Sequence, residues 1–309
     1  MILLTGSTGF IGSFLCNFFN INNIQFKSTS RSDNSQPNNF KIDLNEHTDL
    51  HDLLKNTDVV IHTAAKAHAM DQLEPHHLNE YRKINTLATI NLARQSIKSN
   101  VKKFIFLSTI KVNGEYTKVN ECFSERSNPN PIGPYALSKY EAEEGLIKIF
   151  SNSKVELIIL RIPLVYGPGV KGNLKSLTKA INFFLPLPFK SIQNKRSLLS
   201  IYNLADIILS IINHSGALRQ LYLLSDNKAI SLPELISSIG LSISRKPLLF
   251  YIPSSYLEFI FNAIGKNDQF KKLSENLQID NSLIKKDLNW TQKYDLKNSL
   301  SVFVDPQNP

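Results

Sequence analysis

The sequence predicts an α/β protein with a doubly wound parallel sheet and a smaller C-terminal domain. Short apolar runs alternate with longer amphipathic segments over the first half of the chain. This alternation is typical of parallel strands joined by helices. A glycine-rich turn follows the first apolar run and precedes the first helical pattern. The length of 309 residues is enough for one large or two modest domains, each with its own core.

The periodicity of the apolar residues predicts the individual strands and helices. Strands are predicted near residues 2–5, 24–29, 39–42, 58–62, 103–108 and 155–160. Helices are predicted between them, near residues 10–20, 46–55, 76–98 and 135–150. Helices cover both faces of such a sheet, and ligands bind beyond the carboxyl ends of its strands. After Pro163 the pattern becomes irregular, although the apolar run LYLLS within residues 200–226 reads as a further strand of the sheet.

The first predicted strand leads into three glycines, Gly6, Gly9 and Gly12, and then into an apolar-periodic helix. Strand, glycine turn and helix are the context that a dinucleotide-binding turn requires. The glycines allow a tight turn, a close approach of backbone N–H groups to a pyrophosphate, and close helix–strand packing. The positive end of the helix would then face the phosphates. The spacing is G-x-x-G-x-x-G rather than G-x-G-x-x-G, so an ordinary glycine-rich turn is the alternative.

Tyr135 and Lys139 lie four residues apart in a predicted helix, so both side chains share one face. A free phenol has a pKa of roughly 10, and an ammonium group one turn away is expected to lower that pKa. The pair then suits proton transfer to and from a sugar or alcohol oxygen. Taken alone, the Y-x-x-x-K pattern also fits a solvated helix face.

Composition narrows the class of protein. The net charge is +9, yet the lysines are dispersed and no aromatic-interleaved basic run appears, so nucleic-acid binding is not predicted. The longest apolar region, residues 248–264, is interrupted by proline and polar residues and predicts an amphipathic helix of the smaller domain. A membrane-surface helix is the alternative, and no integral membrane segment is expected. Cys16 and Cys122 lie far apart without metal-ligand spacing, which predicts reduced thiols, a cytoplasmic location and no metal site.

The glycine turn and the Tyr–Lys pair together resemble the extended short-chain dehydrogenases/reductases, the NAD-dependent epimerase/dehydratase family. The resemblance covers nearly the whole chain. Further segments match in order: HTAA at residues 62–65, the Asn85 helix INTLATINL, FLSTIKVNG at 106–114, LRIPLVYGPG at 160–169, RSLLSIYNLAD at 196–206, and a terminal helix ending at Trp290. The resemblance implies a Rossmann-type NAD(P)-binding domain of residues 1–162, with a return segment at 200–226. Residues 163–309 would mainly form the substrate domain.

The resemblance also implies the site residues. Tyr135 would be the catalytic acid/base, Lys139 its electrostatic partner, and Thr109 the hydroxyl that binds the sugar C4 oxygen, with Ser108 as the rival. The implied cofactor contacts are Gly6, Thr8, Gly9, Phe10, Ile11, Gly12, Arg31, Asp43, Leu44, Ala64, Ala65, Tyr135, Lys139 and Pro163. The implied substrate contacts are Lys66, His68, Thr109, Asn173 and Arg196, and a surface or packing role fits all of these but Thr109 equally well.

The cofactor is predicted to be NADP or NAD. An NAD enzyme usually carries an acidic residue at the end of the second strand, where it binds the ribose diol. Here the run is KSTSRSD, and Ser30 and Arg31 would suit a 2′-phosphate. The sequence therefore leans towards NADP, with Asp33 on the ribose as the NAD alternative.

The reaction is narrowed by Ile110 and Lys111. They stand where the family's 4,6-dehydratases carry Asp-Glu, so dehydration is disfavoured. Epimerisation or ketoreduction at C4 of a UDP-hexose or UDP-hexosamine remains, as in the UDP-glucose 4-epimerase-like subgroup of surface-polysaccharide (O-antigen) enzymes. A different class is a catalytically inactive NADP-sensing protein, although such relatives usually lack the Tyr–Lys pair. The resemblance further implies a homodimer through the helices near 76–98 and 135–150.

Overall fold

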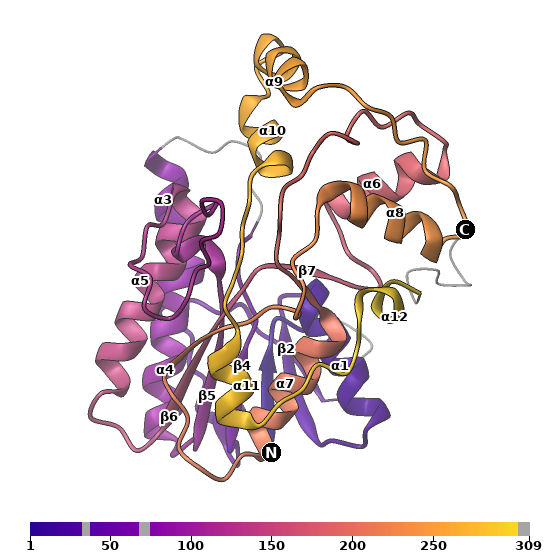
Figure 1. The fold of residues 1–309 in the computed structure, drawn as a ribbon. Coiled ribbons are helices and arrows are strands. Elements are labelled where there is room, and N and C mark those ends of the chain that lie inside the picture. The colour runs from indigo at the N-terminus through magenta and orange to yellow at the C-terminus, as the bar shows by residue number, and fades with distance from the viewer. Residues whose placement is uncertain (33–37, 68–74, 302–309) are drawn as a thin grey trace.

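The computed structural model describes residues 1–32, 38–67 and 75–301, and is built on one parallel sheet (Figure 1). The strand order is β3-β2-β1-β4-β5-β6-β9, and each neighbouring pair is parallel. The strands are β1 (Ile2–Thr5), β2 (Phe26–Ser30), β3 (Asn39–Lys41), β4 (Val59–His62), β5 (Lys103–Thr109), β6 (Glu156–Ile162) and β9 (Leu221–Leu223). The order reverses between β1 and β4. In an open α/β sheet this switch point is where a ligand binds, beyond the carboxyl ends of the strands.

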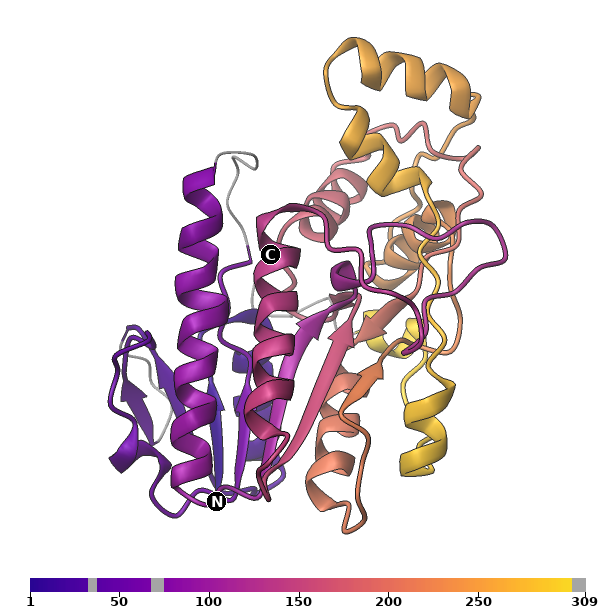
Figure 2. The ribbon, with the colours of Figure 1, turned by 90° about the vertical axis from the view of Figure 1, so that its left-hand side faces the viewer.

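Helices cover both faces of the sheet. On one face lie α1 (Phe10–Ile21) and α7 (Ile201–Asn213), whose apolar sides share a core with β1 and β6. The other face is covered by α2 (His51–Leu54), α4 (Ala88–Lys98) and α5 (Gly133–Phe150). Figure 2 shows α4 and α5 side by side. A short helix α3 (Pro75–Tyr81) and a π-helical turn (Arg82–Leu87) run into α4, and a 3₁₀ turn (Ile110–Val112) follows β5.

A second core lies beyond the carboxyl ends of the strands (Figure 1). Its elements are the strand pair β7 (Leu164–Tyr166) and β8 (Leu198–Ser200) with helices α6 (Asn173–Asn182), α8 (Leu232–Ser242), α9 (Ser254–Ala263), α10 (Asn267–Ser274) and α12 (Leu296–Ser301). None of the helices in the described ranges is both long and apolar enough to span a bilayer. The carboxyl ends of the main strands point towards this second core (Figure 1).

The predicted doubly wound sheet is confirmed, and each of the six predicted strands lies within two residues of its observed bounds. The LYLLS run forms β9 at the sheet edge. The predicted helix 46–55 is reduced to the single turn of α2, because residues 45–49 instead form side-chain–backbone turns around Asn45 and Thr48.

One C-terminal segment does not belong to the second core. Helix α11 (Ser282–Leu288) and Trp290 pack onto the main sheet rather than into the second core. The indole Nε1–H of Trp290 donates to the carboxylate of buried Asp206 in α7, at 2.7 Å. A buried indole N–H usually has a hydrogen-bond acceptor, and Asp206 of α7 supplies it here.

Candidate active site

The glycine turn joins β1 to α1 at the switch point of the sheet. Gly6 has a φ of +79°, and a Cβ there would lie 2.7 Å from the backbone nitrogen of Ala64. A Cβ at Gly12 would lie 2.1 Å from the Gly6 carbonyl oxygen. No side chain caps the N-terminus of α1 at Gly9. The turn is therefore a bare backbone cradle at the positive end of a helix, which fits the pyrophosphate of a dinucleotide.

Thr109 and Tyr135 lie near each other at the same edge of the sheet, two strands away from the glycine turn. Thr109 is the last residue of β5, and Tyr135 lies in the first turn of α5. Burial raises the pKa of Tyr135 to about 12, although the neighbouring Thr109 hydroxyl acts in the opposite direction. The Tyr81 ring packs edge-on against Tyr135, with ring centroids 6.2 Å apart. Thr109 is thus close enough to Tyr135 to affect its pKa.

Lys139 lies one turn after Tyr135 and is almost fully buried. Its ammonium nitrogen is 3.8 Å from the centre of the Phe106 ring. Burial lowers the pKa of Lys139 to about 7, and the nearby carboxylate of Glu143 opposes that shift. The expectation that Lys139 lowers the pKa of Tyr135 is wrong for this structure. The ammonium group faces an aromatic ring, and desolvation of the phenol is the larger effect.

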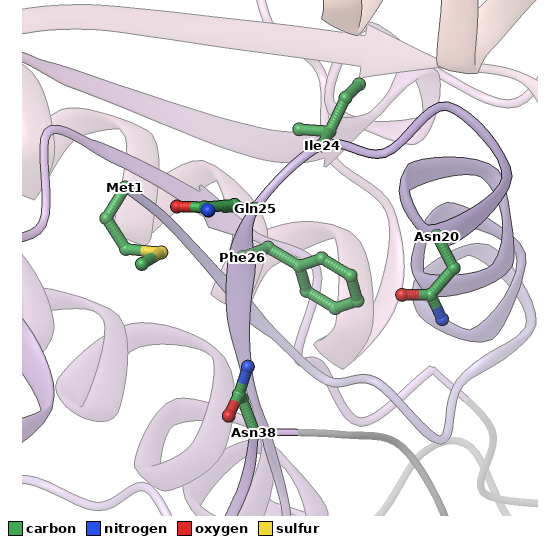
Figure 3. Close-up of a pocket in the computed structure, with 6 residues that line it drawn as sticks. All are labelled: Met1, Asn20, Ile24, Gln25, Phe26 and Asn38. Carbon is green, nitrogen blue, oxygen red and sulfur yellow. The ribbon is translucent and has the colours of Figure 1, made fainter.

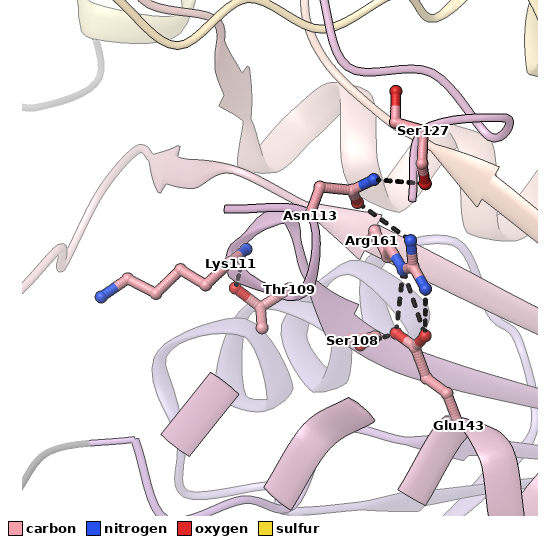
Figure 4. Close-up of polar contacts among 7 residues, drawn as sticks. All are labelled: Ser108, Thr109, Lys111, Asn113, Ser127, Glu143 and Arg161. Carbon is pink, nitrogen blue, oxygen red and sulfur yellow. Dashed lines mark hydrogen bonds and ion pairs between the residues drawn. The ribbon is translucent and has the colours of Figure 1, made fainter. Parts of the chain in front are cut away.

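A buried polar network lies beneath these residues (Figure 4). The Arg161 guanidinium of β6 donates to the Glu143 carboxylate of α5 through Nε at 3.1 Å and Nη2 at 2.6 Å. Its Nη1 donates to the side-chain oxygen of Asn113 at 3.0 Å. The Ser108 hydroxyl donates to Glu143 as well. Because Ser108 is committed to this network, Thr109 is favoured as the hydroxyl that faces the substrate.

The sequence analysis did not identify Glu143 as part of the site. Its signal was the spacing Tyr135, Lys139, Glu143, which puts three polar side chains at i, i+4 and i+8 on one helix face. A carboxylate on the buried face of a helix needs a charged partner. That partner, Arg161, lies on another element, and spacing alone could not reveal it.

His62 lies at the end of β4 and is fully enclosed. Its Nδ1 is 2.6 Å from the Thr5 hydroxyl and its Nε2 is 2.8 Å from the Thr89 hydroxyl. The Thr89 hydroxyl donates to the carbonyl of Asn85, so it accepts from Nε2–H, and Nδ1 accepts from Thr5. The ring is therefore held neutral. Burial, with the positive charge of Lys139 as a smaller cause, lowers its pKa to about 3.

This depressed pKa predicts acid sensitivity. The unfolded chain binds a proton at His62 near pH 6.5 and the folded chain near pH 3, so stability present above pH 6.5 is lost as the pH falls. Between pH 6.5 and 4.5 we expect this group to cost about 2–3 kcal/mol of unfolding free energy. Urea titrations of the wild type and of His62→Gln at both pH values measure it. A variant with the same pH dependence as the wild type would contradict the assignment.

Two predicted substrate residues have structural partners. Lys66 forms an ion pair with Glu80, and its backbone N–H donates to the buried Asn85 side chain at 2.8 Å. Arg196 is half-buried, and its guanidinium donates to the Glu275 carbonyl at 3.0 Å. Burial lowers the pKa of Arg196, while Glu115, which follows the 3₁₀ turn after Thr109, acts in the opposite direction. Arg196 therefore links the second core to the loop that leaves β5.

The other predicted residues are placed as follows. Asn173 begins α6 and is exposed, Arg31 is exposed at the end of β2, and Pro163 is buried between β6 and β7. The remaining cofactor positions, Thr8, Phe10, Ile11, Asp43, Leu44, Ala64 and Ala65, lie in the glycine turn and α1, after β3, or after β4. His68 and Asp33 lie outside the described residues. No cluster of three or more metal-ligating side chains occurs within the described ranges.

A shallow pocket at the opposite end of the sheet does not belong to this site (Figure 3). It is lined by Met1, Asn20, Ile24, Gln25, Phe26 and Asn38, around the amino ends of β1 and β2. The glycine turn and Thr109 lie at the carboxyl ends of their strands. The glycine turn and Thr109 therefore lie at the edge where α/β sheets bind ligands.

Residues 2–223 match the model of the "NAD dependent epimerase/dehydratase family". The chain belongs to this family. A UDP-glucose 4-epimerase from Vibrio cholerae is 40% identical over 316 residues, which cover 99% of this chain and 96% of that protein. The predicted resemblance is confirmed, and the chain is an enzyme of the extended short-chain dehydrogenase/reductase type.

Solved structures of epimerases have the same fold. UDP-glucuronic acid 4-epimerase from Bacillus cereus, in complex with UDP-glucuronic acid and NAD, has a TM-score of 0.79 at 21% identity, covering 98% of each chain. UDP-glucose 4-epimerase from Thermotoga maritima, with UDP-glucose, has a TM-score of 0.76 at 21% identity, covering 98% of this chain and 97% of the other. The Rossmann-like architecture of this epimerase/dehydratase family member is therefore shared along its whole length.

Proposed function

We propose that this chain is a UDP-sugar 4-epimerase that works through a nicotinamide dinucleotide. The observation that carries the proposal is the placement of the Thr109–Tyr135 pair on the same sheet edge as the glycine cradle. The cradle ends β1 and Thr109 ends β5, with β4 between them. At about 4.8 Å per strand the two lie roughly 10 Å apart across the sheet, a span that an extended dinucleotide covers. The whole-chain similarity to a UDP-glucose 4-epimerase supports the same reaction.

The roles of the side chains follow from their contacts. Thr109 would hold the C4 hydroxyl of the sugar, and Tyr135 would take its proton and later return it. The bound nicotinamide would supply hydride transfer at C4. Loss of the C4 hydride and the hydroxyl proton leaves a C4 ketone. Return of the hydride to the opposite face of C4, and of the proton to the oxygen, inverts C4. Lys139, buried one helical turn from Tyr135, would supply positive charge to the site, and its lowered pKa would make that charge sensitive to pH near neutrality.

The cofactor proposal rests on the end of β2. Ser30 is buried there and Arg31 is exposed, and among the described residues of this strand end there is no carboxylate. A guanidinium beside a hydroxyl would accept a 2′-phosphate by charge-assisted hydrogen bonds. We propose that the site admits NADP as well as the NAD that its solved relatives contain.

The quaternary proposal rests on α4 and α5. These helices pack side by side on one flank (Figure 2), with the Arg82–Glu141 ion pair between the preceding π-helical turn and α5. Leu87 and Ile147 are partly exposed there, each at 37%. We propose that this flank pairs with a second copy to form a homodimer. We also propose that the enzyme serves surface-polysaccharide synthesis, as the subgroup that it resembles does.

The test is incubation with UDP-glucose, UDP-N-acetylglucosamine and, separately, a UDP-4-keto-6-deoxyhexosamine, each with NAD or with NADPH. NMR follows the configuration at C4, and absorbance follows the reduced nicotinamide. We expect C4 inversion of a UDP-hexose or UDP-hexosamine without net consumption of cofactor. Consumption of one NADPH per keto sugar, with no inversion, would instead identify a 4-ketoreductase. Cofactor binding without either reaction would identify the inactive sensor.

A further inference from the structure

Helix α9 has two apolar faces, and only one of them is packed. On the inner face Leu257 is 2% exposed, and the Phe261 ring lies 5.3 Å from the Phe270 ring of α10. The outer face carries Tyr256, Phe259, Ile260 and Ile264, which are 65%, 73%, 46% and 58% exposed. Their spacing of i, i+3, i+4 and i+8 aligns them along one stripe. Within the described ranges this stripe has no cover, and α9 is the outermost element of the molecule (Figure 1).

Two other segments of the second core also expose large apolar side chains. Residues 248–251 contain exposed Leu248, Phe250 and Tyr251. They run beside the segment after α6, where the Leu187 N–H donates to the Leu248 carbonyl at 2.8 Å. Exposed large apolar side chains therefore gather in residues 183–185, 248–251 and 256–264, here called the apolar tip. Soluble monomers rarely expose contiguous apolar patches of this kind without an interaction to serve.

The residues that flank the apolar tip carry most of the net positive charge of the chain, although the tip itself contains no Lys or Arg. Residues 171–190 and 241–272 contain nine Lys or Arg residues and two acidic residues, a net charge of +7 out of +9 for the whole protein. Seven of these basic side chains are exposed. The Arg245 guanidinium stacks over the Phe184 ring at 5.2 Å, so charge and aromatic surface are interleaved. Lys and Arg side chains near an anionic bilayer are attracted to its surface.

This combination selects one kind of partner. A second copy presenting the same tip would bring like charges together, and the proposed dimer flank at α4 and α5 lies elsewhere (Figure 2). A nucleic acid would not bury the aliphatic side chains of Ile260 and Ile264. An amphipathic helix with aromatic residues on its outer face and cations beside it is typical of segments that lie in the headgroup region of a membrane. We propose that the apolar tip docks this enzyme on an anionic bilayer surface, with α9 lying in the membrane plane.

The test is co-sedimentation of the full chain with vesicles of phosphatidylcholine alone or mixed with phosphatidylglycerol. We expect binding to the anionic vesicles, weak binding to the neutral ones, and loss of binding at high salt. Phe259→Glu with Ile264→Glu should lower the partition coefficient at least tenfold. Ile21→Glu is the matched control, because Ile21 is 80% exposed on α1, away from the tip. Lys246→Glu with Lys266→Glu should weaken only the anionic binding.

Several results would overturn the proposal. One is the absence of binding to anionic vesicles, and another is equal binding by the tip variant and the Ile21→Glu control. Sedimentation velocity that shows self-association lost in the tip variant would assign the surface to a second copy. Turnover of a soluble UDP-sugar without vesicles should be unchanged by the tip substitutions. The docking proposal can thus fail while the proposed reaction stands, and the reverse also holds.

Discussion

Replacing Tyr135 with phenylalanine is expected to lower kcat by roughly 10²–10⁴-fold, because it removes the proposed proton carrier and little else. The ring and its edge-on contact with Tyr81 are retained. Only the hydroxyl next to Thr109 is lost. Binding of the dinucleotide and of the UDP-sugar should change little, so kcat and kcat/KM should fall together. The measurement is steady-state epimerisation with cofactor binding titrated in parallel.

Tyr140→Phe is the matched control for that variant. Tyr140 lies on the same helix, five residues after Tyr135, and no contact with Thr109 is found for it. Its hydroxyl should be dispensable for turnover. If Tyr135→Phe and Tyr140→Phe retain similar activity, the assigned role of Tyr135 is wrong. If Tyr135→Phe loses the cofactor as well, the hydroxyl serves binding rather than proton transfer.

Much of this fold could be predicted because its signals are local. The strand at residues 2–5 and the three glycines lie in one continuous stretch, so the turn at the switch point could be derived from spacing and backbone sterics. The pairing of Tyr135 with Thr109 could be expected only from the family resemblance. These residues come from different elements, and only the fold brings them together.

What could not be predicted depends on side-chain direction and on burial. Lys139 shares a helix face with Tyr135, but its long flexible side chain turns towards Phe106, and no sequence pattern records that rotamer. The pKa of Tyr135 is set mainly by burial, which raises it, and not by a neighbouring charge. The π-helical turn around Asn85 follows from a tertiary contact, since that side chain bonds to both backbone groups of Lys66. The Glu143–Arg161 pair likewise joins α5 to β6 across the core.

Neutralising Glu143 is expected to destabilise the protein by about 3–5 kcal/mol, because Glu143→Gln leaves the Arg161 guanidinium buried without its carboxylate. Glu143 is 1% exposed and Arg161 is 4% exposed. The Ser108 hydroxyl and the Asn113 side chain would lose the hydrogen-bond geometry that the ion pair now fixes. Chemical denaturation measures the loss of unfolding free energy. An unchanged dependence of that free energy on denaturant concentration checks two-state behaviour.

Glu141→Gln is the internal control on the same helix. Its bidentate partner Arg82 is 40% exposed and Glu141 is 28% exposed, so solvent screens that pair. We expect a loss of about 0–1 kcal/mol there. Similar losses from the two substitutions would show that burial does not set the cost.

The double variant Glu143→Leu with Arg161→Met separates a buried charge from a needed contact. If Glu143→Gln destabilises the protein because the guanidinium stays buried without its carboxylate, removing both charges should recover most of the stability. Turnover should respond differently, because the Glu143 carboxylate raises the pKa of Lys139, which burial alone depresses. The double variant should therefore fold well and yet lose activity in the neutral range as Lys139 loses its proton more readily. A double variant that is as unstable as Glu143→Gln would place the effect in packing rather than in charge.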